Sequence, residues 1–220
     1  MEKLYISITE GLISGDNEKT EELTQQALES GLQAQDILDK ALLKGMEIVG
    51  ARFKNGEMYI PEVLKCARTM HCAIDVLAPY TSENDTNSRG SIVIGTVQGD
   101  LHDIGKNLVG MMCEGAGFEV IDLGIDIKAQ EFVKAVEKNG ADILAMSALL
   151  TTTMPKMVET LHMLEKAGCR ENLKVMIGGA PVTEDFANEI GADGFAPNAA
   201  SAVDKAKEFM EEIESPRAAA

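Results

Sequence analysis

The sequence predicts a small helical bundle followed by an α/β domain with a parallel sheet. Residues 1–80 place apolar side chains mostly three or four positions apart, which is the period of an amphipathic helix. After residue 90 the pattern changes to short runs rich in Val and Ile, and helical stretches separate these runs. Strands that alternate with helices are typical of a parallel sheet with helices on both faces.

The helical half is expected to contain four helices, at residues 3–13, 18–30, 36–53 and 61–77. Gly56 lies just past the third helix, as is common after a helix end. Pro61 falls in the first turn of the fourth helix, where the N–H that proline lacks would make no intrahelical hydrogen bond. Four short helices form a small bundle, so residues 1–80 are predicted to be one helical domain.

The α/β half follows a polar segment. Residues 81–90 contain no large apolar residue and are rich in Ser, Thr and Asn, which indicates a linker. Five strands are then expected, at residues 91–97, 119–123, 142–147, 174–177 and 194–196. Helices are expected near residues 105–116, 128–139, 154–168, 183–190 and 199–213. Such strands fit a flavodoxin-like (Rossmann-like) domain over residues 91–215, which binds ligands beyond the carboxyl ends of its strands.

Composition and charge exclude several classes of function. The formal net charge is −16, with 36 acidic and 20 basic residues, so the surface repels phosphate backbones and nucleic acid is not an expected partner. No apolar run approaches the length of about 18 residues that a membrane helix needs. The first residues do not form a secretory signal, and the four cysteines show no C-x-x-C spacing. We therefore expect a cytoplasmic protein without a disulfide framework.

Segment 99–107 (GDLHDIGKN) follows the first strand directly, where a sheet of this kind binds its ligand. It is not a phosphate-binding P-loop, because five residues instead of four separate Gly99 from Gly105. In addition, Asn107 stands where a hydroxyl should hold Mg²⁺. A zinc site built by the protein alone needs three or four ligands, and the other two histidines lie on distant helices.

His102 in this segment can be interpreted as a structural residue or as a metal ligand. Taken alone, a single histidine is more often structural. However, a metal whose equatorial positions are filled by a macrocycle needs only one axial ligand from the protein. Such a histidine usually donates its other ring N–H to a carboxylate, and Asp100 could supply that carboxylate from two residues earlier on the same loop.

Three sequence elements resemble the cobalamin-binding signature of methionine synthase and the corrinoid methyl-carrier proteins. They are D-x-H-D-x-G, then S-x-L after 41 residues (106–146), then a Gly pair after a further 28 (150–177). Their members, in order, are Asp100, His102, Asp103, Gly105, Ser147, Leu149, Gly178 and Gly179. Three elements in this order, at the family's separations, make the resemblance specific. It extends into the helical half, where NGEMYIP (55–61) resembles the segment that leads into the helix covering the corrin.

The resemblance implies that cobalamin or a related corrinoid binds with its dimethylbenzimidazole detached from cobalt (base-off). His102 would replace that base as the lower axial ligand (His-on). Asp100 would orient His102, and Thr153 would continue this relay at a position where the family often has Ser.

Further residues are implied to contact the cofactor. Ser147 and Thr151 would line the pocket for the nucleotide arm at the end of the third strand, and Leu149 would also contact the cofactor. Residues 149–153 fit a plain strand end and helix cap as the alternative. The Gly pair 178–179 would let the arm pass close to the backbone, or form a simple turn. Gly105 would let the loop approach the corrin, and Asp103 would contact the cofactor or only cap the helix after it. Tyr59, Val63 and Met70 are candidates to cover the upper cobalt face, with ordinary bundle core as the alternative for Val63 and Met70.

The function implied is that of a carrier subunit and not of an enzyme on its own, because 220 residues leave no room for a substrate barrel of about 250 residues. The methyl group on cobalt would pass from a substrate:corrinoid methyltransferase to a second methyltransferase with a folate or thiol acceptor. A reductive activase would be a further partner. Methanol, methylamines, betaines and aryl methyl ethers are all possible donors.

Two alternative functions remain. The small subunit of an adenosylcobalamin-dependent mutase resembles residues 90–215 but lacks a helical cap, so residues 1–80 count against it. A cobalamin-dependent light sensor and repressor would need a basic DNA-binding domain, which the acidic composition disfavours.

Overall fold

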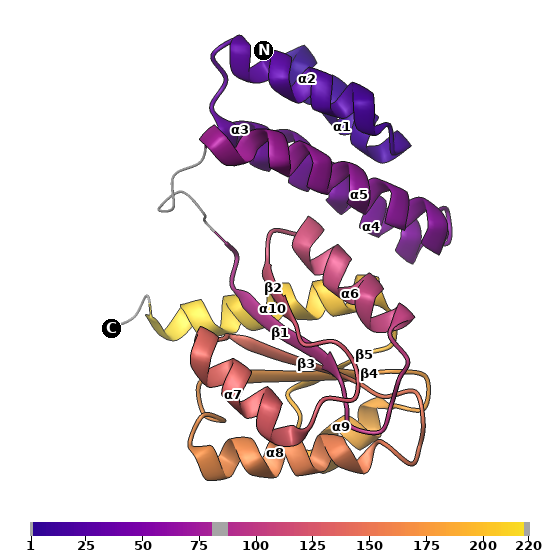
Figure 1. Ribbon diagram of the computed structural model, residues 1–220, viewed down its shortest axis with the longest axis vertical. Helices are drawn as coiled ribbons and strands as arrows, with labels where there is room; N and C mark the ends of the chain where they lie inside the picture. Colours follow the sequence, from indigo (N-terminus) through magenta and orange to yellow (C-terminus); the bar gives the residue numbers. More distant parts are fainter. Residues whose placement is uncertain (1, 81–87, 218–220) are drawn as a thin grey trace. The chain divides into compact units, whose positions relative to one another are not determined.

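The computed structural model describes residues 2–80 and 88–217, so most of the expected linker lies outside the described residues. The described residues form two compact units, one with residues 2–80 and 115–117 and the other with residues 88–114 and 118–217 (Figure 1). Within the described ranges, no helix is both long and apolar enough to cross a membrane.

The first unit is a four-helix bundle, as the sequence predicts. Its helices are α1 (Glu2–Ser14), α2 (Asn17–Glu29), a continuous helical stretch, and α5 (Ile60–Leu77), followed by the short 3-10 helix η2 (Ala78–Tyr80). The continuous stretch joins α3 (Ala34–Ile37), the π-helix η1 (Leu38–Leu43) and α4 (Lys44–Lys54). The hydroxyl of Thr9 in α1 donates to the carbonyl of Ala41 in the π-helical turn at 3.0 Å. A π-helical turn shifts the backbone hydrogen bonds by one residue, which the apolar spacing did not predict.

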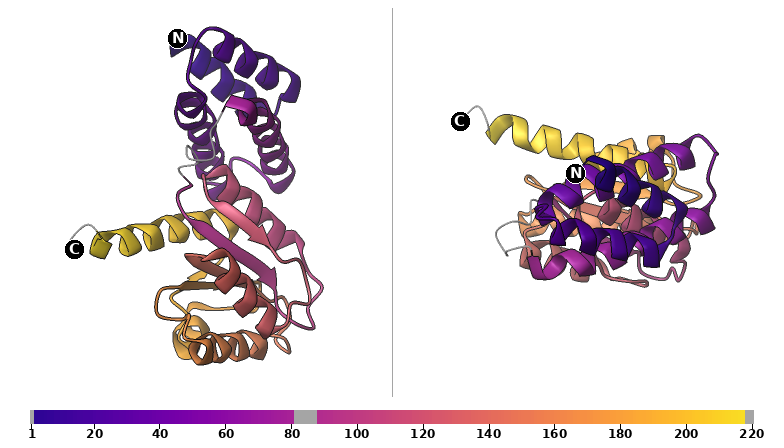
Figure 2. Two further views of the ribbon diagram at one scale, coloured as in Figure 1. Left: turned by 60° about the vertical axis from the view of Figure 1, so that its left-hand side comes forward. Right: turned by 90° about the horizontal axis from the view of Figure 1, so that it is seen from above.

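The second unit contains a five-stranded parallel sheet in the order β2-β1-β3-β4-β5, which confirms the flavodoxin-like prediction. The strands are β1 (Ser91–Thr96), β2 (Glu119–Asp122), β3 (Ile143–Ser147), β4 (Lys174–Gly178) and β5 (Gly194–Ala196). The helices are α6 (Ile104–Gly115), α7 (Ala129–Asn139), α8 (Pro155–Ala167), α9 (Glu184–Ile190) and α10 (Ala199–Arg217). Figures 1 and 2 show α7 and α8 on one face of the sheet and α6 and α10 on the other.

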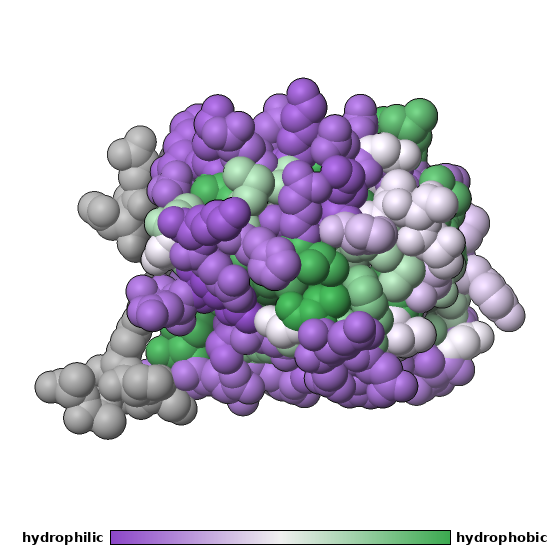
Figure 3. Space-filling model, turned by 90° about the horizontal axis from the view of Figure 1, so that it is seen from below, coloured by the Kyte–Doolittle hydropathy of each residue, from purple (hydrophilic) through white to green (hydrophobic). Residues whose placement is uncertain are grey.

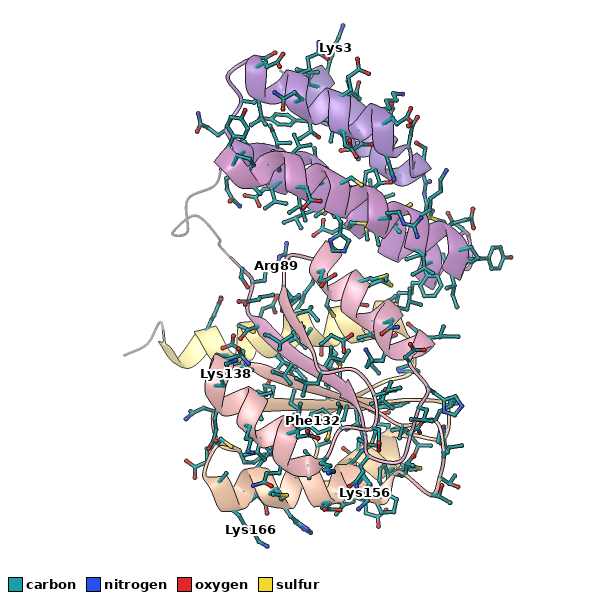
Figure 4. The ribbon with its side chains drawn as sticks, in the orientation of Figure 1. Lys3, Arg89, Phe132, Lys138, Lys156 and Lys166 are labelled. Atoms are coloured by element: carbon teal, nitrogen blue, oxygen red, sulfur yellow. The ribbon has the colours of Figure 1, made fainter. Side chains whose placement is uncertain are left out.

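The core of this unit follows the alternation of side chains along the strands. Val93, Leu144 and Val175 face α7, α8 and α9 in one buried cluster. Phe132 of α7 points toward the sheet in the same cluster (Figure 4). Its ring packs over Gly95 of β1, where a Cβ atom would lie 2.7 Å from the ring. Helix α7 is thereby held against β1.

The strand ends are aligned across the sheet. Thr96 at the end of β1 pairs with Ser147 of β3, which pairs with Gly178 of β4, which in turn pairs with Ala196 of β5. The loops that follow these four strands therefore begin side by side along one edge. The strand order reverses between β1 and β3, and this is the position at which such sheets bind ligands.

Candidate functional site

A buried carboxylate, Asp100, lies in the loop after β1 and joins two loops. Its Oδ1 lies 2.6 Å from Nδ1 of His102 and also accepts the backbone N–H of His102 at 3.2 Å. Its Oδ2 accepts the hydroxyl of Thr153 at 2.9 Å and the backbone N–H groups of Leu149 at 2.7 Å and Leu150 at 3.2 Å. Asp100 is fully buried, and these bonds compensate the removal of its charge from water.

The sheet explains how groups about fifty residues apart meet. Because β1 and β3 are neighbours and Thr96 pairs with Ser147, the loops after both strands start next to each other at the carboxyl edge of the sheet. Thr153 closes a tight turn after β3, in which its backbone N–H donates to the carbonyl of Leu150 at 3.1 Å. This turn directs the hydroxyl of Thr153 and two backbone N–H groups toward Asp100.

The ionisation of Asp100 determines which nitrogen of His102 is available. Burial alone would raise the pKa of the Asp100 carboxyl. Hydrogen bonds from the His102 ring, from the backbone of Leu149 and His102 and from the Thr153 hydroxyl instead hold that pKa well below its usual value. An ionised carboxylate can only accept hydrogen bonds, so the proton between the two groups belongs to Nδ1 of His102. In the neutral ring Nε2 then keeps its lone pair, and the side chain is 52% exposed.

The two glycines at the end of β4 are required by the fold itself. A Cβ atom on Gly179, whose φ is +125°, would lie 1.9 Å from the carbonyl oxygen of Ala148. A Cβ atom on Gly178 would lie 2.9 Å from the carbonyl oxygen of Ala196. Gly105 differs from both, because a Cβ atom there would meet no atom within 4 Å. The protein leaves open space at Gly105, beside the start of α6.

Other predicted residues of this unit lie along the same edge. Ser147 is partly buried at the end of β3, and Thr151 is exposed in the turn that follows. Asp103 is exposed just before α6, and its carboxylate accepts the side-chain amide of Asn107 at 3.2 Å.

The buried residue Lys106 is a feature that the sequence does not reveal. Its ammonium donates to Oδ2 of Asp122 at 2.5 Å and to Oδ1 of Asn107 at 2.6 Å. The Lys106 side chain is 1% exposed, whereas that of Asp122 is 44% exposed. This ion pair joins the end of β2 to the first turn of α6.

The predicted cap residues lie in the helical unit. Val63 and Met70 are buried on α5, while Tyr59, directly before α5, is exposed. The backbone N–H of Tyr59 donates to the carboxylate of Glu62 at 2.8 Å, which caps the helix. Of the three, Tyr59 keeps its ring accessible.

Apolar side chains are exposed at the carboxyl edge of the sheet. Among the described residues of this unit, the strongly exposed large hydrophobic residues are Leu101, Ile104, Ile125, Leu149 and Leu150. Four of them lie in the loops after β1, β2 and β3, and Ile104 is the first residue of α6, directly after the loop that follows β1. The face drawn in Figure 3 is largely hydrophilic, with a few apolar patches between the hydrophilic residues. Apolar residues in the segments that follow strands are a signal that the sequence carries, and of these five only Leu149 was identified from the sequence as a site residue.

Comparisons with known proteins agree across both halves of the chain. A family model described as a B12 binding domain matches residues 90–205, and a second model with the same description matches residues 7–78. A corrinoid protein of Desulfitobacterium hafniense (strain Y51) is 43% identical over 210 residues, which cover 94% of this chain and 97% of that protein. A trimethylamine corrinoid protein of Methanosarcina barkeri is 39% identical, over 94% of this chain and 96% of its own length.

A solved structure extends the similarity to three dimensions. A chain of the methanol:cobalamin methyltransferase complex MtaBC from Methanosarcina barkeri superimposes with a TM-score of 0.87 and is 30% identical. The match covers 95% of this chain and 80% of that one.

Proposed function

Because the chain belongs to the family of corrinoid methyl-carrier proteins, we propose that it carries a methyl group on cobalt between two methyltransferases. The first would be a substrate:corrinoid methyltransferase, and the second would transfer the group to a folate or thiol. The observation that carries this proposal is the environment of His102. Its Nδ1 is held by a buried, ionised carboxylate, while half of its side chain is exposed at the edge where such sheets bind ligands.

Nε2 of His102 is proposed as the lower axial ligand of cobalt, with the corrinoid bound base-off and His-on. A histidine that donates its other ring N–H to a carboxylate is a more basic ligand and has a fixed orientation. Thr153 completes this relay, because its hydroxyl holds the second oxygen of Asp100 at 2.9 Å. When bound, the corrinoid supplies the cobalt that accepts and donates the methyl group. The protein supplies the ligand, its tautomer and access to it.

The residues present fit a large, mostly apolar macrocycle. Leu101 and Ile104 flank His102, and Leu149 and Leu150 lie on the neighbouring loop; all four are exposed. Covering such side chains contributes about 25 cal/mol for each Å² of apolar surface that leaves water. A Cβ atom at Gly105 would meet no atom within 4 Å, so the backbone at the start of α6 is open to a ligand there.

Further residues are proposed to contact the nucleotide arm and the corrin. Ser147 and Thr151 are proposed to contact the nucleotide arm beyond β3, together with Gly178 and Gly179, which lie at the end of the adjacent strand β4. Asp103 and Leu149 are also proposed to contact the cofactor. Tyr59 is the most accessible of the proposed cap contacts, since Val63 and Met70 are buried.

The chain would work as a carrier subunit and not as an enzyme on its own. The names of its relatives include trimethylamine, and the similar solved structure is a complex that acts with methanol. Methylamines and methanol are therefore the first donors to test. We also propose a reductive activase as a partner and a cytoplasmic location, since all four cysteines are free thiols, as expected in a reducing compartment.

Electron paramagnetic resonance of the cob(II)alamin-loaded protein tests the axial ligand. With ¹⁵N in the protein's histidines, the splitting from the axial nitrogen should change, whereas ¹⁵N in the benzimidazole should leave it unchanged. His102→Ala should abolish the protein-derived splitting. His162→Ala, which removes an exposed histidine on α8, should have no effect. A splitting that follows the benzimidazole label would reject His-on binding. Methyl transfer with each candidate methyltransferase then tests the carrier role.

A further inference from the structure

Asp126 has an unusual backbone conformation. It lies between β2 and α7 and, in the part of the chain that the structure describes, is the only residue other than glycine with a positive φ, at +57°. Most side chains are strained in this left-handed region, and Asp tolerates it better because its short polar group can hydrogen-bond locally. A residue kept in such a conformation indicates that the surrounding structure requires it.

The contacts of Asp126 show what is required. Its Oδ1 accepts the backbone N–H of Gly99 at 2.7 Å, and its own N–H donates to the carbonyl of Asp100 at 3.1 Å. Both bonds cross from the loop after β2 to the loop after β1. They hold the backbone on both sides of the Asp100 α-carbon, and so they set the position from which its carboxylate reaches His102.

Thr96 fixes the other end of the same segment. This residue is fully buried at the end of β1, and its hydroxyl donates to the carbonyl of His102 at 2.8 Å. A buried hydroxyl needs a partner, and here the partner is the backbone of His102 itself. The segment from Gly99 to His102 is therefore anchored by side chains outside it at both ends.

Hydrophobic packing contributes little to holding this segment in place. Of the six described residues 99–104, only Asp100 is buried. Its neighbours have few apolar contacts to restrict them, so the hydrogen bonds determine where the ring of His102 lies.

From these contacts we propose that Asp126 and Thr96 are positioning residues for His102. Asp126 sets the place of Asp100, and Thr96 sets the place of the His102 backbone. Together they keep Nδ1 on the carboxylate and Nε2 directed away from it. This role rests on the proposed function of His102 as the axial ligand, and both residues act through His102 and Asp100.

Four variants separate positioning from general stability. Asp126→Asn keeps an acceptor oxygen and tolerates a positive φ, so it should behave as the unmodified protein does. Asp126→Gly accepts the conformation but removes the acceptor. Thr96→Val keeps the shape and removes the hydroxyl. Asp142→Ala is the matched control, because Oδ2 of Asp142 accepts the backbone N–H of Ser91 at 2.9 Å at the opposite, amino edge of the sheet.

The first measurement uses the full chain without cofactor, labelled with ¹⁵N at its three histidines. Nuclear magnetic resonance should show the Nδ1–H tautomer of His102 in the unmodified protein. In Asp126→Gly and Thr96→Val, exchange of that proton with water should be about tenfold faster, because each variant loses one hydrogen bond that holds the pair. Asp126→Asn and Asp142→Ala should stay within about twofold of the unmodified protein.

The second measurement repeats the paramagnetic resonance experiment on the same variants loaded with cob(II)alamin. The fraction with a protein nitrogen on cobalt should fall at least twofold in Asp126→Gly and Thr96→Val and be restored in Asp126→Asn. Wild-type exchange rates and an unchanged fraction in both loss variants would overturn the positioning role, as would an equal effect of Asp142→Ala. If the unmodified protein lacks the nitrogen signal, the axial ligand is wrong, and the exchange rates without cofactor still decide the positioning role.

Discussion

At the amino edge of the sheet, Oδ2 of Asp142 accepts the N–H and the hydroxyl of Ser91, and these bonds only join β3 to β1. At the carboxyl edge, Asp100 also accepts backbone N–H groups from the loop after β3. However, its other oxygen, Oδ1, binds the ring of His102, whose side chain is half exposed. The same chemical device stabilises the fold at one edge and prepares a ligand at the other.

Exposed apolar residues sharpen the contrast between the two edges. The five strongly exposed large hydrophobic residues described in this unit all follow strand ends at the carboxyl edge. Exposed apolar side chains that cluster around a polar group are typical of a binding site. The difference teaches that the carboxyl edge retains apolar surface and an oriented nitrogen that folding alone does not require.

The largest effect is expected where the carboxyl edge serves the fold. Gly179→Ala places a Cβ atom 1.9 Å from the carbonyl of Ala148 and forces alanine to a φ of +125°. Neither backbone can yield without separating β4 from β3, so the free energy of unfolding should fall by about 4 kcal/mol or more. Thermal unfolding followed by circular dichroism measures this loss. A stable Gly179→Ala protein would show that the two strand ends can separate, and the glycine would then be explained by the cofactor.

The ion pair between β2 and α6 should respond unequally to its two partners. Asp122→Ala leaves the ammonium of Lys106 buried without a counter-charge and should lower the free energy of unfolding by about 3 kcal/mol. Lys106→Met removes the buried charge, and the 44% exposed carboxylate of Asp122 can be hydrated instead, so the loss should be about 1 kcal/mol. Urea unfolding of both variants checks the order. Equal losses of unfolding free energy in the two variants would show that the carboxylate of Asp122 is not hydrated when Lys106 is replaced.

The charge of Asp100 should stabilise the cofactor-free protein in a pH-dependent way. Its pKa is lowered in the folded state by hydrogen bonds, so its contribution is fully present above the unfolded value of about 3.9 and is lost as the pH falls through the folded value. Asp100→Asn should therefore lower the free energy of unfolding by about 2 kcal/mol at pH 7. The difference between the two proteins should shrink below about pH 4. Urea unfolding between pH 3 and 7 measures it; a difference that stays constant with pH would mean that Asp100 is not ionised in the folded protein.

Much of the fold follows from patterns that any buried parallel sheet must show. Strands covered on both faces need nearly continuous apolar runs, and such runs mark β1, β3 and β4. The edge strands β2 and β5 are shorter and less buried, and their mark in the sequence is weaker. The π-helical turn at Leu38–Leu43 was not predicted, because apolar spacing indicates a helix without showing which backbone groups pair within it.

The candidate site was predictable where side chains contact one another close in sequence. Asp100 and His102 are two residues apart, so their pairing could be expected from chemistry alone. Asp126 could not be identified in this way, because it binds only backbone atoms and leaves no spacing pattern. The need for Gly179 depends on the carbonyl of Ala148, which only the folded sheet brings near.

The smallest effect on stability should come from Gly105→Ala, and this variant separates binding from folding most cleanly. A Cβ atom at Gly105 meets nothing within 4 Å, and alanine favours the first turn of α6, so the free energy of unfolding should change by less than about 0.5 kcal/mol. If the corrin lies against this turn, the added methyl group should weaken cobalamin binding about tenfold, as overpacking does in other tight contacts.

Gly110→Ala is the matched control. It lies in the same helix, and its Cβ atom would make an ordinary 3.7 Å contact with Val120 inside the unit, so cobalamin affinity should not change. Titration of both variants with cobalamin, followed by absorbance, gives the two dissociation constants. Unchanged affinity in Gly105→Ala would place the corrin away from the start of α6.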